Sequence, residues 1–365
     1  MAGIWCTNCH SSYPASHAPF RCGACGGVYD YQEGFAYNPE QVNSNQPGIW
    51  KYRHTFGLPE KAPVVSLGEG DTPLIWAEAF GRQVAFKCEY LNPTGSFKDR
   101  GTPVTISFLR SRGVEAVVED SSGNAGASFA AYCSRAGMRG KVFVPAYASG
   151  PKRRQIEAYG CEVILVKGPR SAASEAVMEE ANSGTVYASH AYVPFSLAGY
   201  ATAAYEIVTQ LGQAPAVVIN LAGHGSFLVG LSRVFQALYG AGEIDQKPVL
   251  VGVQARVCAP LWAIFTAGPG GLGFATEGNT LAEGVRVLTP IRGDALLPMV
   301  ESSGGTFLAI EEEDILPGVD ELARRGMYVE PTSAIVWQGL KQVIAQGVPD
   351  PIVVILTGSG LKSGQ

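Results

Sequence analysis

Short apolar runs alternate with helical patterns along most of the chain, and this alternation restricts the possible folds more than any other feature. The runs have the length and composition of buried parallel strands and cover residues 116–118, 141–144, 163–166, 217–221, 249–253 and 352–356. Between them apolar residues recur at helix spacing, as after Gly225, where Leu228, Leu231 and Leu238 share one face. The alternation predicts an α/β fold with parallel sheets that helices cover on both faces.

Length and composition fit two packed domains with an appendage and disfavour several classes of protein. A chain of 365 residues that is 46% hydrophobic and 16% charged is too long for one small core and can bury large ones. Its net charge of −5 gives no electrostatic basis for binding nucleic acid. The sequence has no run of 18 apolar residues and no signal peptide, so we expect no membrane association and a cytoplasmic location.

Four of the eight cysteines form two closely spaced pairs near the N-terminus. Cys6 with Cys9 and Cys22 with Cys25 give the pattern CxxC-x12-CxxC, which can place four thiolates around one tetrahedral Zn²⁺. One alternative is a pair of disulfides, which a reducing compartment disfavours, and another is a redox pair, which lacks its usual thioredoxin-like context. We predict a structural zinc ribbon over residues 1–35, whose metal has no open coordination position.

Lys98 follows a glycine–serine turn and begins a predicted helix beside Phe97. A lysine in a partly apolar pocket can lose its proton near neutral pH, because burial disfavours the ammonium. Such a lysine can form a Schiff base with a carbonyl compound. Because a lone lysine is more often a solvated surface charge, the interpretation of Lys98 depends on the rest of the chain.

Three loops of small polar residues follow predicted strands, where binding sites of parallel sheets are found. Residues 223–226 precede an amphipathic helix, and the N–H groups and dipole at a helix start favour a phosphate. This loop is not a dinucleotide-binding fingerprint, because Leu228 stands where that motif has its third glycine. Residues 120–126 suit a carboxylate as well as a helix cap. Thr357 offers a hydroxyl to a heterocyclic nitrogen, although alone it would indicate only a turn.

These motifs, together with one more, occur in the order and spacing of a known family. They are VSLGEGDTPL at 65–74, GSFKDRG at 95–101, SSGN at 121–124, GHGS at 223–226 and LTGSGLK at 356–362. The chain resembles the pyridoxal-phosphate enzymes of fold type II, the tryptophan synthase β-like fold, and within them threonine synthase and its paralogues. The resemblance covers roughly residues 60–362, and some relatives also carry an N-terminal zinc ribbon.

The resemblance implies a role for each motif. Lys98 would bind pyridoxal 5′-phosphate as a Schiff base and then act as the base at the substrate Cα. Asn124 would bond to the ring hydroxyl, and Thr357 would face the pyridine nitrogen as a neutral partner, which favours elimination and replacement. In the phosphate loop, His224 is expected to act as a donor rather than as a catalytic base. The remaining residues would bind anions, namely the cofactor phosphate at Gly223, His224, Gly225 and Ser226 and the substrate carboxylate at Ser121, Ser122 and Gly123.

The same resemblance implies two domains and a homodimer. A small domain over residues 80–190 would carry Lys98, and a large domain over 36–79 and 191–365 would carry the phosphate loop. The cofactor would lie between them, and closure would exclude water. We expect aromatic residues to dock the ribbon on the large domain or a partner subunit. Nucleic-acid binding is disfavoured, because Arg21 is the only fixed cation in residues 1–35.

For the reaction, the resemblance favours a carbon–oxygen lyase that converts O-phosphohomoserine to threonine and phosphate. Lys152 and Arg153 would then bind the substrate phosphate, although cations at this point also suit a solvated helix start. Two departures favour other small amino-acid substrates. Ala125 stands where threonine synthases usually have threonine, and residues 281–286 are more similar to dehydratases and racemases. The alternatives are a β-elimination or β-replacement enzyme acting on serine, threonine or an activated serine, and an amino-acid racemase.

Overall fold

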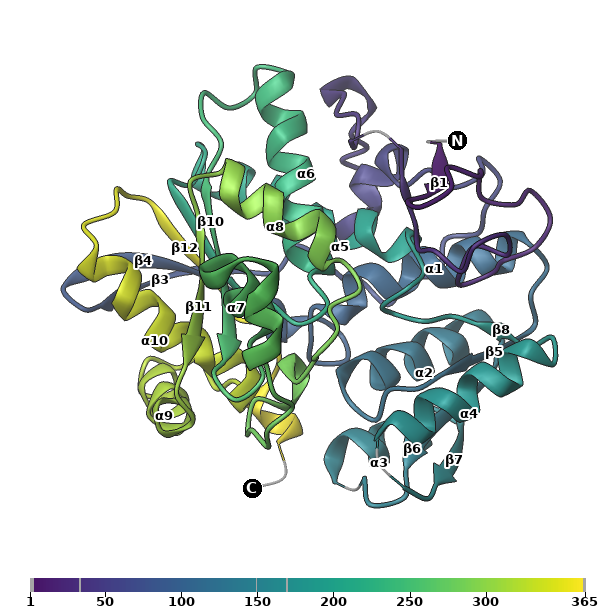
Figure 1. The fold of residues 1–365 in the computed structure, drawn as a ribbon. Coiled ribbons are helices and arrows are strands. Elements are labelled where there is room, and N and C mark those ends of the chain that lie inside the picture. Colours follow the sequence, from purple (N-terminus) through teal and green to yellow (C-terminus); the bar gives the residue numbers. More distant parts are fainter. Residues whose placement is uncertain (1–2, 33, 149, 169, 364–365) are drawn as a thin grey trace. The chain divides into compact units, whose positions relative to one another are not determined.

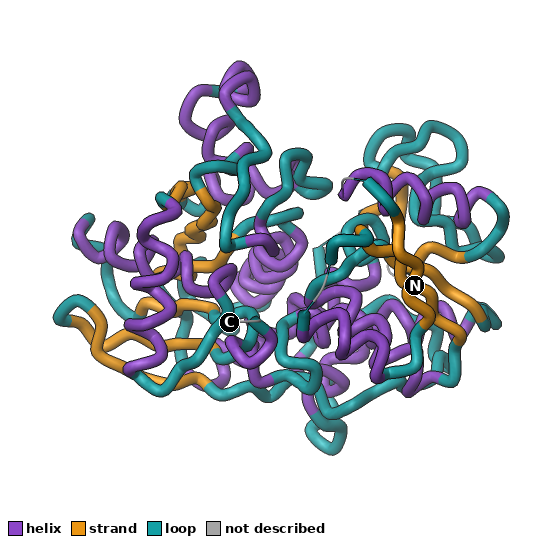
Figure 2. Tube along the Cα trace, turned by 90° about the horizontal axis from the view of Figure 1, so that it is seen from below, coloured by secondary structure: helices purple, strands orange, loops and turns teal. Residues whose placement is uncertain are grey.

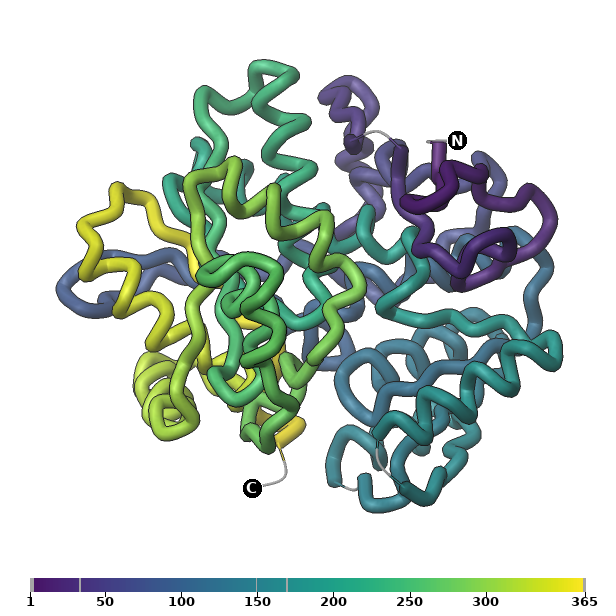
Figure 3. The backbone as a smooth tube through the Cα atoms, in the orientation of Figure 1, coloured from purple at the N-terminus to yellow at the C-terminus, as the bar shows by residue number. Residues whose placement is uncertain are grey.

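The computed structural model describes residues 3–32, 34–148, 150–168 and 170–363, and the chain divides into two compact units (Figure 1). The N-terminal unit comprises residues up to 70 and residues 92–200, and the C-terminal unit comprises residues 71–91 and 201–363. Helix α5 (Phe195–Leu211) begins in the first unit and ends in the second. Figure 2 distinguishes the helices and strands of each unit, and Figure 3 follows the chain by residue number.

The N-terminal unit is built around a parallel sheet with the strand order β7-β6-β5-β8. Phe143 and Val118 pack with Val177 of α4 on one face, while Gly140 of β6 lies against Phe129 of α2 on the other. Helices therefore cover both faces, as the apolar strands require. The strands are β5 (Ala116–Glu119), β6 (Arg139–Pro145), β7 (Glu162–Val166) and β8 (Val186–Tyr187), and the helices are α1 (Lys98–Ser111), α2 (Asn124–Ala136), α3 (Pro151–Ala158) and α4 (Arg170–Asn182).

A small antiparallel sheet of β1 (Ile4–Cys6) and β2 (Tyr29–Tyr31) lies at the start of this unit. The ring centroid of Tyr13 lies 5.9 Å from that of Phe108 and 5.4 Å from that of Phe195, and Phe20 lies 5.0 Å from Tyr187. Aromatic packing thus docks the cysteine-rich segment on the unit that carries Lys98. Phe195 lies within the range predicted for the large domain, on which docking was expected, whereas Phe108 and Tyr187 lie within the range predicted for the small domain.

The C-terminal unit contains a sheet with the order β11-β10-β9-β12-β4-β3, in which only the β3–β4 pair is antiparallel among the described strands. In β11, Phe307 packs on Phe265 of α7 and the next residue, Leu308, faces Gly339 of α10, so α7 and α10 cover opposite faces. The strands are β3 (Leu74–Ala79), β4 (Arg82–Lys87), β9 (Val217–Leu221), β10 (Val249–Ala255), β11 (Thr306–Ile310) and β12 (Ile352–Ile355), and the helices are α6 (Ser226–Gly240), α7 (Pro260–Ala267), α8 (Gly293–Ser302), α9 (Ile315–Arg324) and α10 (Pro331–Ala345).

The predicted α/β fold with parallel sheets is confirmed, and each of the six apolar runs forms a strand. Besides β1 and β2 of the cysteine-rich segment, strands β3, β8 and β11 were not predicted, nor was the pairing of β3 with β4 in a hairpin. The hairpin turns at Phe80 (φ 51°) and Gly81 (φ 76°), two successive left-handed residues that suit the twist of an antiparallel pair. Among the described helices, none is both long and apolar enough to cross a membrane.

The observed units divide the chain differently from the predicted domains. Residues 48–70 belong with the Lys98-bearing unit, because the buried carboxylate of Glu69 accepts hydrogen bonds from Trp50 Nε1 at 2.7 Å and from the Tyr132 hydroxyl of α2 at 2.8 Å. Residues 80–91 belong with the other unit, because β4 pairs with β12.

Candidate active site

Lys98 is half-buried at the first position of α1, after a loop that is fixed by Asp99. The buried carboxylate of Asp99 accepts hydrogen bonds from the Thr94 N–H at 2.6 Å and from the Thr94 hydroxyl at 2.7 Å. Lys98 Nζ lies 4.8 Å from the ring centroid of Phe97 and 5.7 Å from that of Tyr200. Burial lowers the pKa of Lys98 to about 8, although the nearby carboxylate of Glu119 acts in the opposite direction. A large fraction of this amine is therefore neutral under mildly basic conditions.

The loop that follows β5 is tightly folded against the start of α2. The Gly123 N–H donates to Ser121 Oγ at 3.2 Å, and Asn124 is the first residue of α2. A Cβ on Gly126 would lie 1.8 Å from the carbonyl oxygen of Ser121, so this position requires glycine. The first N–H groups of a helix have no partner within it, so the loop presents donors suited to a carboxylate.

A buried carboxylate, Glu119, stands immediately before this loop and contacts His190, and neither residue was predicted from the sequence. Glu119 Oε1 lies 2.6 Å from His190 Nδ1, and Glu119 Oε2 accepts from the His190 N–H at 3.2 Å. Burial raises the pKa of Glu119 to about 7 and lowers that of His190 to about 3. The sequence shows a Glu directly after a predicted strand, but it does not indicate that His190, far along the chain, is its partner.

Lys152 and Arg153 lie in α3 of the same unit, half-buried near its first turn. Helix α3 is joined to the Lys98 loop, because Gln155 Nε2 donates to the carbonyl oxygen of Thr94 at 3.2 Å. Arg153 Nε also lies 2.9 Å from Glu157 Oε1 in an i,i+4 ion pair. The predicted cations are thus held close to the Lys98 loop in the fold, with Arg153 partly neutralised by Glu157.

The glycine loop at residues 223–226 lies in the C-terminal unit, between β9 and α6. Gly225 has φ +90°, and a Cβ on Gly223 would lie 3.2 Å from the carbonyl oxygen of Gly284, so side chains are poorly tolerated at both positions. The His224 carbonyl oxygen accepts a hydrogen bond from the Arg292 N–H at 2.9 Å. The loop therefore presents main-chain groups at the start of a 15-residue helix, the arrangement that favours an anion.

Thr357 is buried two residues after the end of β12, and its N–H donates to Ser333 Oγ of α10 at 2.8 Å. Strand β12 is the parallel neighbour of β9 in the sheet. Because the carboxyl ends of parallel strands meet at the same edge, Thr357 and the 223–226 loop share that edge of the C-terminal unit.

Comparison with known proteins decides the family. Residues 65–358 match the model of the pyridoxal-phosphate dependent enzymes. The chain belongs to this family. The prediction of a pyridoxal-phosphate enzyme of fold type II is thereby confirmed.

Curated relatives of this pyridoxal-phosphate enzyme include threonine synthases. The one from Methanocaldococcus jannaschii is 34% identical, over 98% of this chain and 92% of that protein. The one from Synechocystis is 35% identical, over 86% of this chain and 82% of that protein. These relatives thus match the family named from the motifs.

Solved structures with the same fold include a maize serine racemase, with a TM-score of 0.67 and 20% identity over 79% of this chain and 88% of that one. Another is a threonine deaminase from T.th., with a TM-score of 0.64 and 25% identity over 80% of this chain and 93% of that one. These likenesses concern the fold, which hosts several reactions.

The residues present fit the cofactor that the family implies. Its aldehyde reacts with a neutral amine, and the lowered pKa of Lys98 makes that form more abundant near physiological pH than for an ordinary lysine. Its phosphate requires close approach of main-chain N–H groups, and Gly223 and Gly225 permit that approach at the start of α6. Its ring nitrogen requires a polar partner, and Thr357 is a hydroxyl at the same sheet edge as the glycine loop.

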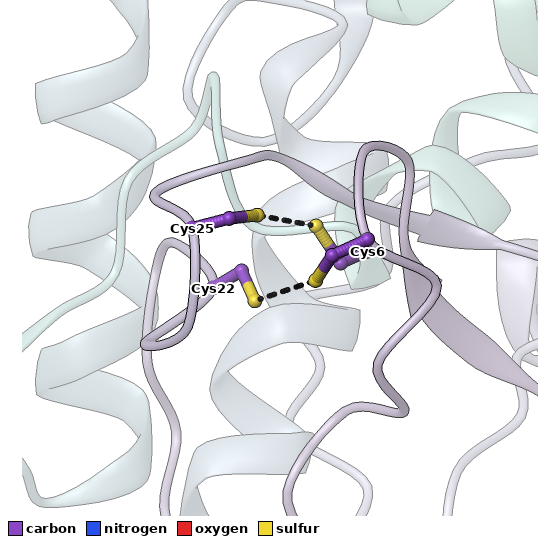
Figure 4. Close-up of side chains that lie close together, drawn as sticks. Cys6, Cys22 and Cys25 are labelled. Carbon is purple, nitrogen blue, oxygen red and sulfur yellow. Dashed lines mark hydrogen bonds between the residues drawn. The ribbon is translucent and has the colours of Figure 1, made fainter.

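The four N-terminal cysteines converge as their spacing predicts (Figure 4). Cys6 Sγ lies 3.4 Å from Cys25 Sγ, Cys9 Sγ lies 3.6 Å from Cys22 Sγ, and all four sulfurs lie within 4.8 Å of one another. Both knuckles close in the same way, with the His10 N–H bonded to the Cys6 carbonyl and the Gly26 N–H bonded to the Cys22 carbonyl.

This sulfur arrangement fits a tetrahedral zinc ion. A Zn–S distance of about 2.3 Å in a tetrahedron places neighbouring sulfurs about 3.8 Å apart, close to the spacing of these thiols. His10 (φ 59°) and Gly26 (φ 73°) take left-handed conformations just after the second cysteine of each knuckle. A histidine thus performs in the first knuckle the task that a glycine performs in the second.

Proposed function

We propose that this pyridoxal-phosphate enzyme is a threonine synthase-type lyase that converts O-phosphohomoserine to threonine and phosphate. The observation that carries the proposal is the similarity to the threonine synthase of M. jannaschii, which extends over 98% of this chain and 92% of that protein. The similarity therefore extends over both units and the cysteine-rich segment, and is not limited to the fold that the solved structures share.

The chain's own groups have the chemistry that this reaction needs. Pyridoxal phosphate, when bound, stabilises negative charge at the substrate Cα. Lys98 binds the cofactor and then moves protons at the substrate carbon, a task suited to an amine whose pKa is about 8. Asn124 and Thr357 orient the ring.

Two sets of donors at helix starts hold the anionic groups. The N-terminus of α6, at Gly223, His224, Gly225 and Ser226, binds the cofactor phosphate. The loop before α2, at Ser121, Ser122 and Gly123, binds the substrate carboxylate.

In this proposal, Lys152 and Arg153 bind the phosphate of the substrate. Changing both to alanine is expected to lower kcat/KM for O-phosphohomoserine roughly ten- to hundred-fold, because hydrogen bonds to charged groups contribute about 1.5–3 kcal/mol. Cofactor binding should not change. Arg154→Ala is the matched control, since Arg154 is an exposed cation on the same helix. Unchanged turnover of O-phosphohomoserine in the double variant would contradict the assignment.

A second function is favoured by two observations at the same sites. Arg153 already pairs with Glu157, and Ala125 lacks the hydroxyl usual in threonine synthases. Both features suit a β-elimination or β-replacement enzyme that acts on serine, threonine or an activated serine. Such an enzyme needs no binding site for a substrate phosphate. Keto-acid release from serine or threonine, insensitive to the Lys152 and Arg153 changes, would establish this alternative.

We also propose that the cysteine cluster binds one structural Zn²⁺. Elemental analysis should find about one zinc per chain, and Cys22→Ser should remove it and loosen the ribbon. Turnover should change little at saturating substrate, because four thiolates leave no open metal position. Cys258→Ser, a change at a buried cysteine in the other unit, should retain the metal. Zinc-free protein with two disulfides in the ribbon would refute the zinc site.

A further inference from the structure

Glu119 is held in one position by two contacts from His190. The carboxylate is 1% exposed at the end of β5, and the His190 side chain is 14% exposed. The His190 N–H bonds to one carboxylate oxygen at 3.2 Å, and the ring Nδ1 lies 2.6 Å from the other. Further bonds fix the turn that carries the histidine, since Ser189 Oγ accepts from the Ala191 N–H at 3.3 Å. A carboxylate fixed in this way has little freedom to turn toward water.

This pair and Lys98 have neighbouring residues in common. Glu119 and His190 line a small cavity within the N-terminal unit that is also lined by Thr102 and Tyr200. The Tyr200 ring centroid is 5.7 Å from Lys98 Nζ, and the Thr102 hydroxyl bonds to the Lys98 carbonyl oxygen at 3.0 Å. The negative charge of Glu119 favours the ammonium form of Lys98, whereas burial favours the neutral amine.

Within the Glu119–His190 pair, the carboxylate and not the imidazole is the group that carries charge. Burial keeps the pKa of His190 near 3, so its ring is neutral at physiological pH, whereas the pKa of Glu119 is about 7. The Asp120 carboxylate accepts hydrogen bonds from the hydroxyls of Ser174 at 2.5 Å and Tyr187 at 2.7 Å, and Glu119 is the carboxylate that raises the pKa of Lys98. The charged groups that affect the pKa of Glu119 or His190 are Lys98, Asp120 and Arg170. Glu119 in turn raises the pKa of three other groups, those of Cys133, Tyr187 and Tyr200.

We propose that Glu119, fixed by His190, is a positioning residue that sets the protonation state of the Lys98 amine. The catalytic role of Glu119 rests on the proposed function. Its electrostatic effect on the Lys98 amine does not, because that effect is present without cofactor or substrate. When Lys98 carries a proton, the Glu119 carboxylate stabilises the ammonium, and when the carboxylate is neutralised the amine releases its proton more readily. In catalysis this device would retain a proton on Lys98 between its removal from one substrate carbon and its return to another.

The test is the pH dependence of Lys98 labelling by 1-fluoro-2,4-dinitrobenzene in the full-length chain freed of cofactor. Mass spectrometry of the peptide that contains Lys98 gives the rate, which follows the neutral amine. In the unmodified chain the rate should titrate near pH 8. Glu119→Gln should lower this pKa by about 1 or more, so that labelling at pH 7 becomes about five-fold faster. Glu69→Gln, a change at another buried carboxylate of the same unit, should leave the titration unchanged.

Two further variants keep the test decisive if Glu119→Gln does not fold. Glu119→Asp withdraws the charge by one methylene and should shift the titration less, in the same direction. His190→Asn removes the ring that fixes the carboxylate and should also shift it. A titration of Lys98 that is unchanged in every folded variant would overturn the inference.

Failure of the proposed function has a different signature. If borohydride does not fix pyridoxal phosphate on Lys98 of the unmodified chain, the proposed role of Lys98 fails, while the labelling data still decide the role of Glu119. If the cofactor is fixed but Glu119→Gln does not shift the titration, only the inference fails.

Discussion

Lys98→Ala is expected to lower turnover by about a thousand-fold and to abolish the covalent attachment of pyridoxal phosphate. The reason is that one amine both holds the cofactor and moves protons, and proton transfer by a positioned side chain alone contributes about 10²–10⁴. The measurement combines initial rates at saturating cofactor with borohydride reduction and peptide mapping. In the unmodified chain the added mass should lie on the peptide that contains Lys98.

Lys141→Ala is the control for this change, because Lys141 is a lysine of the same unit whose side chain is 41% exposed in an ion pair with Glu180. It should keep both turnover and labelling. Retention of the cofactor on another lysine, with normal turnover in Lys98→Ala, would show that the active amine has been misassigned.

Lys87→Met is expected to destabilise the C-terminal unit by about 3–5 kcal/mol, because it leaves the carboxylate of Glu206 buried without its counter-charge. The two side chains are 0% and 3% exposed, and Lys87 Nζ lies 2.6 Å from Glu206 Oε2. The same ammonium donates to the Thr72 carbonyl oxygen at 2.7 Å and to Gln210 Oε1 at 3.0 Å. Urea denaturation followed by tryptophan fluorescence measures the loss.

The double variant Lys87→Met with Glu206→Met should recover part of this stability, because it removes both charges together. The exposed pair of Arg256 and Glu311 provides a comparison, since its side chains are 36% and 56% exposed and Arg256→Ala should cost less than about 1 kcal/mol. Equal unfolding midpoints for Lys87→Met and the unmodified chain would mean that the pair contributes no net stability.

Features encoded by neighbouring residues could be predicted from the sequence. The cysteine knuckles depend on turns of four or five residues, and the structure closes both within that span. Strand β9 and the loop at residues 223–226 follow from a continuous apolar run that ends in glycines before a helical pattern. In each case local chemistry suffices to indicate the element and the type of ligand.

Features that depend on strand register could not be predicted. Glu119 and His190 are 71 residues apart, and they meet because Val117 pairs with Val186 and Val118 with Tyr187 in parallel β5 and β8. Strand β8 is too short to give a periodic signal, so nothing in the sequence indicated this pairing.

The sequence also did not indicate which unit residues 48–70 belong to, because this too depends on contacts between residues far apart in the chain. Glu69 was visible only as part of a family motif, although its buried hydrogen bonds to Trp50 and Tyr132 attach residues 48–70 to the Lys98-bearing unit.

The most direct test of the proposed function measures phosphate and threonine together during turnover of O-phosphohomoserine by the purified, cofactor-loaded protein. We expect equal amounts of both products, formed in parallel and lost in Lys98→Ala. Release of no phosphate by a protein that carries the cofactor on Lys98 would contradict it, and keto acid formed from serine or threonine would identify the alternative lyase instead.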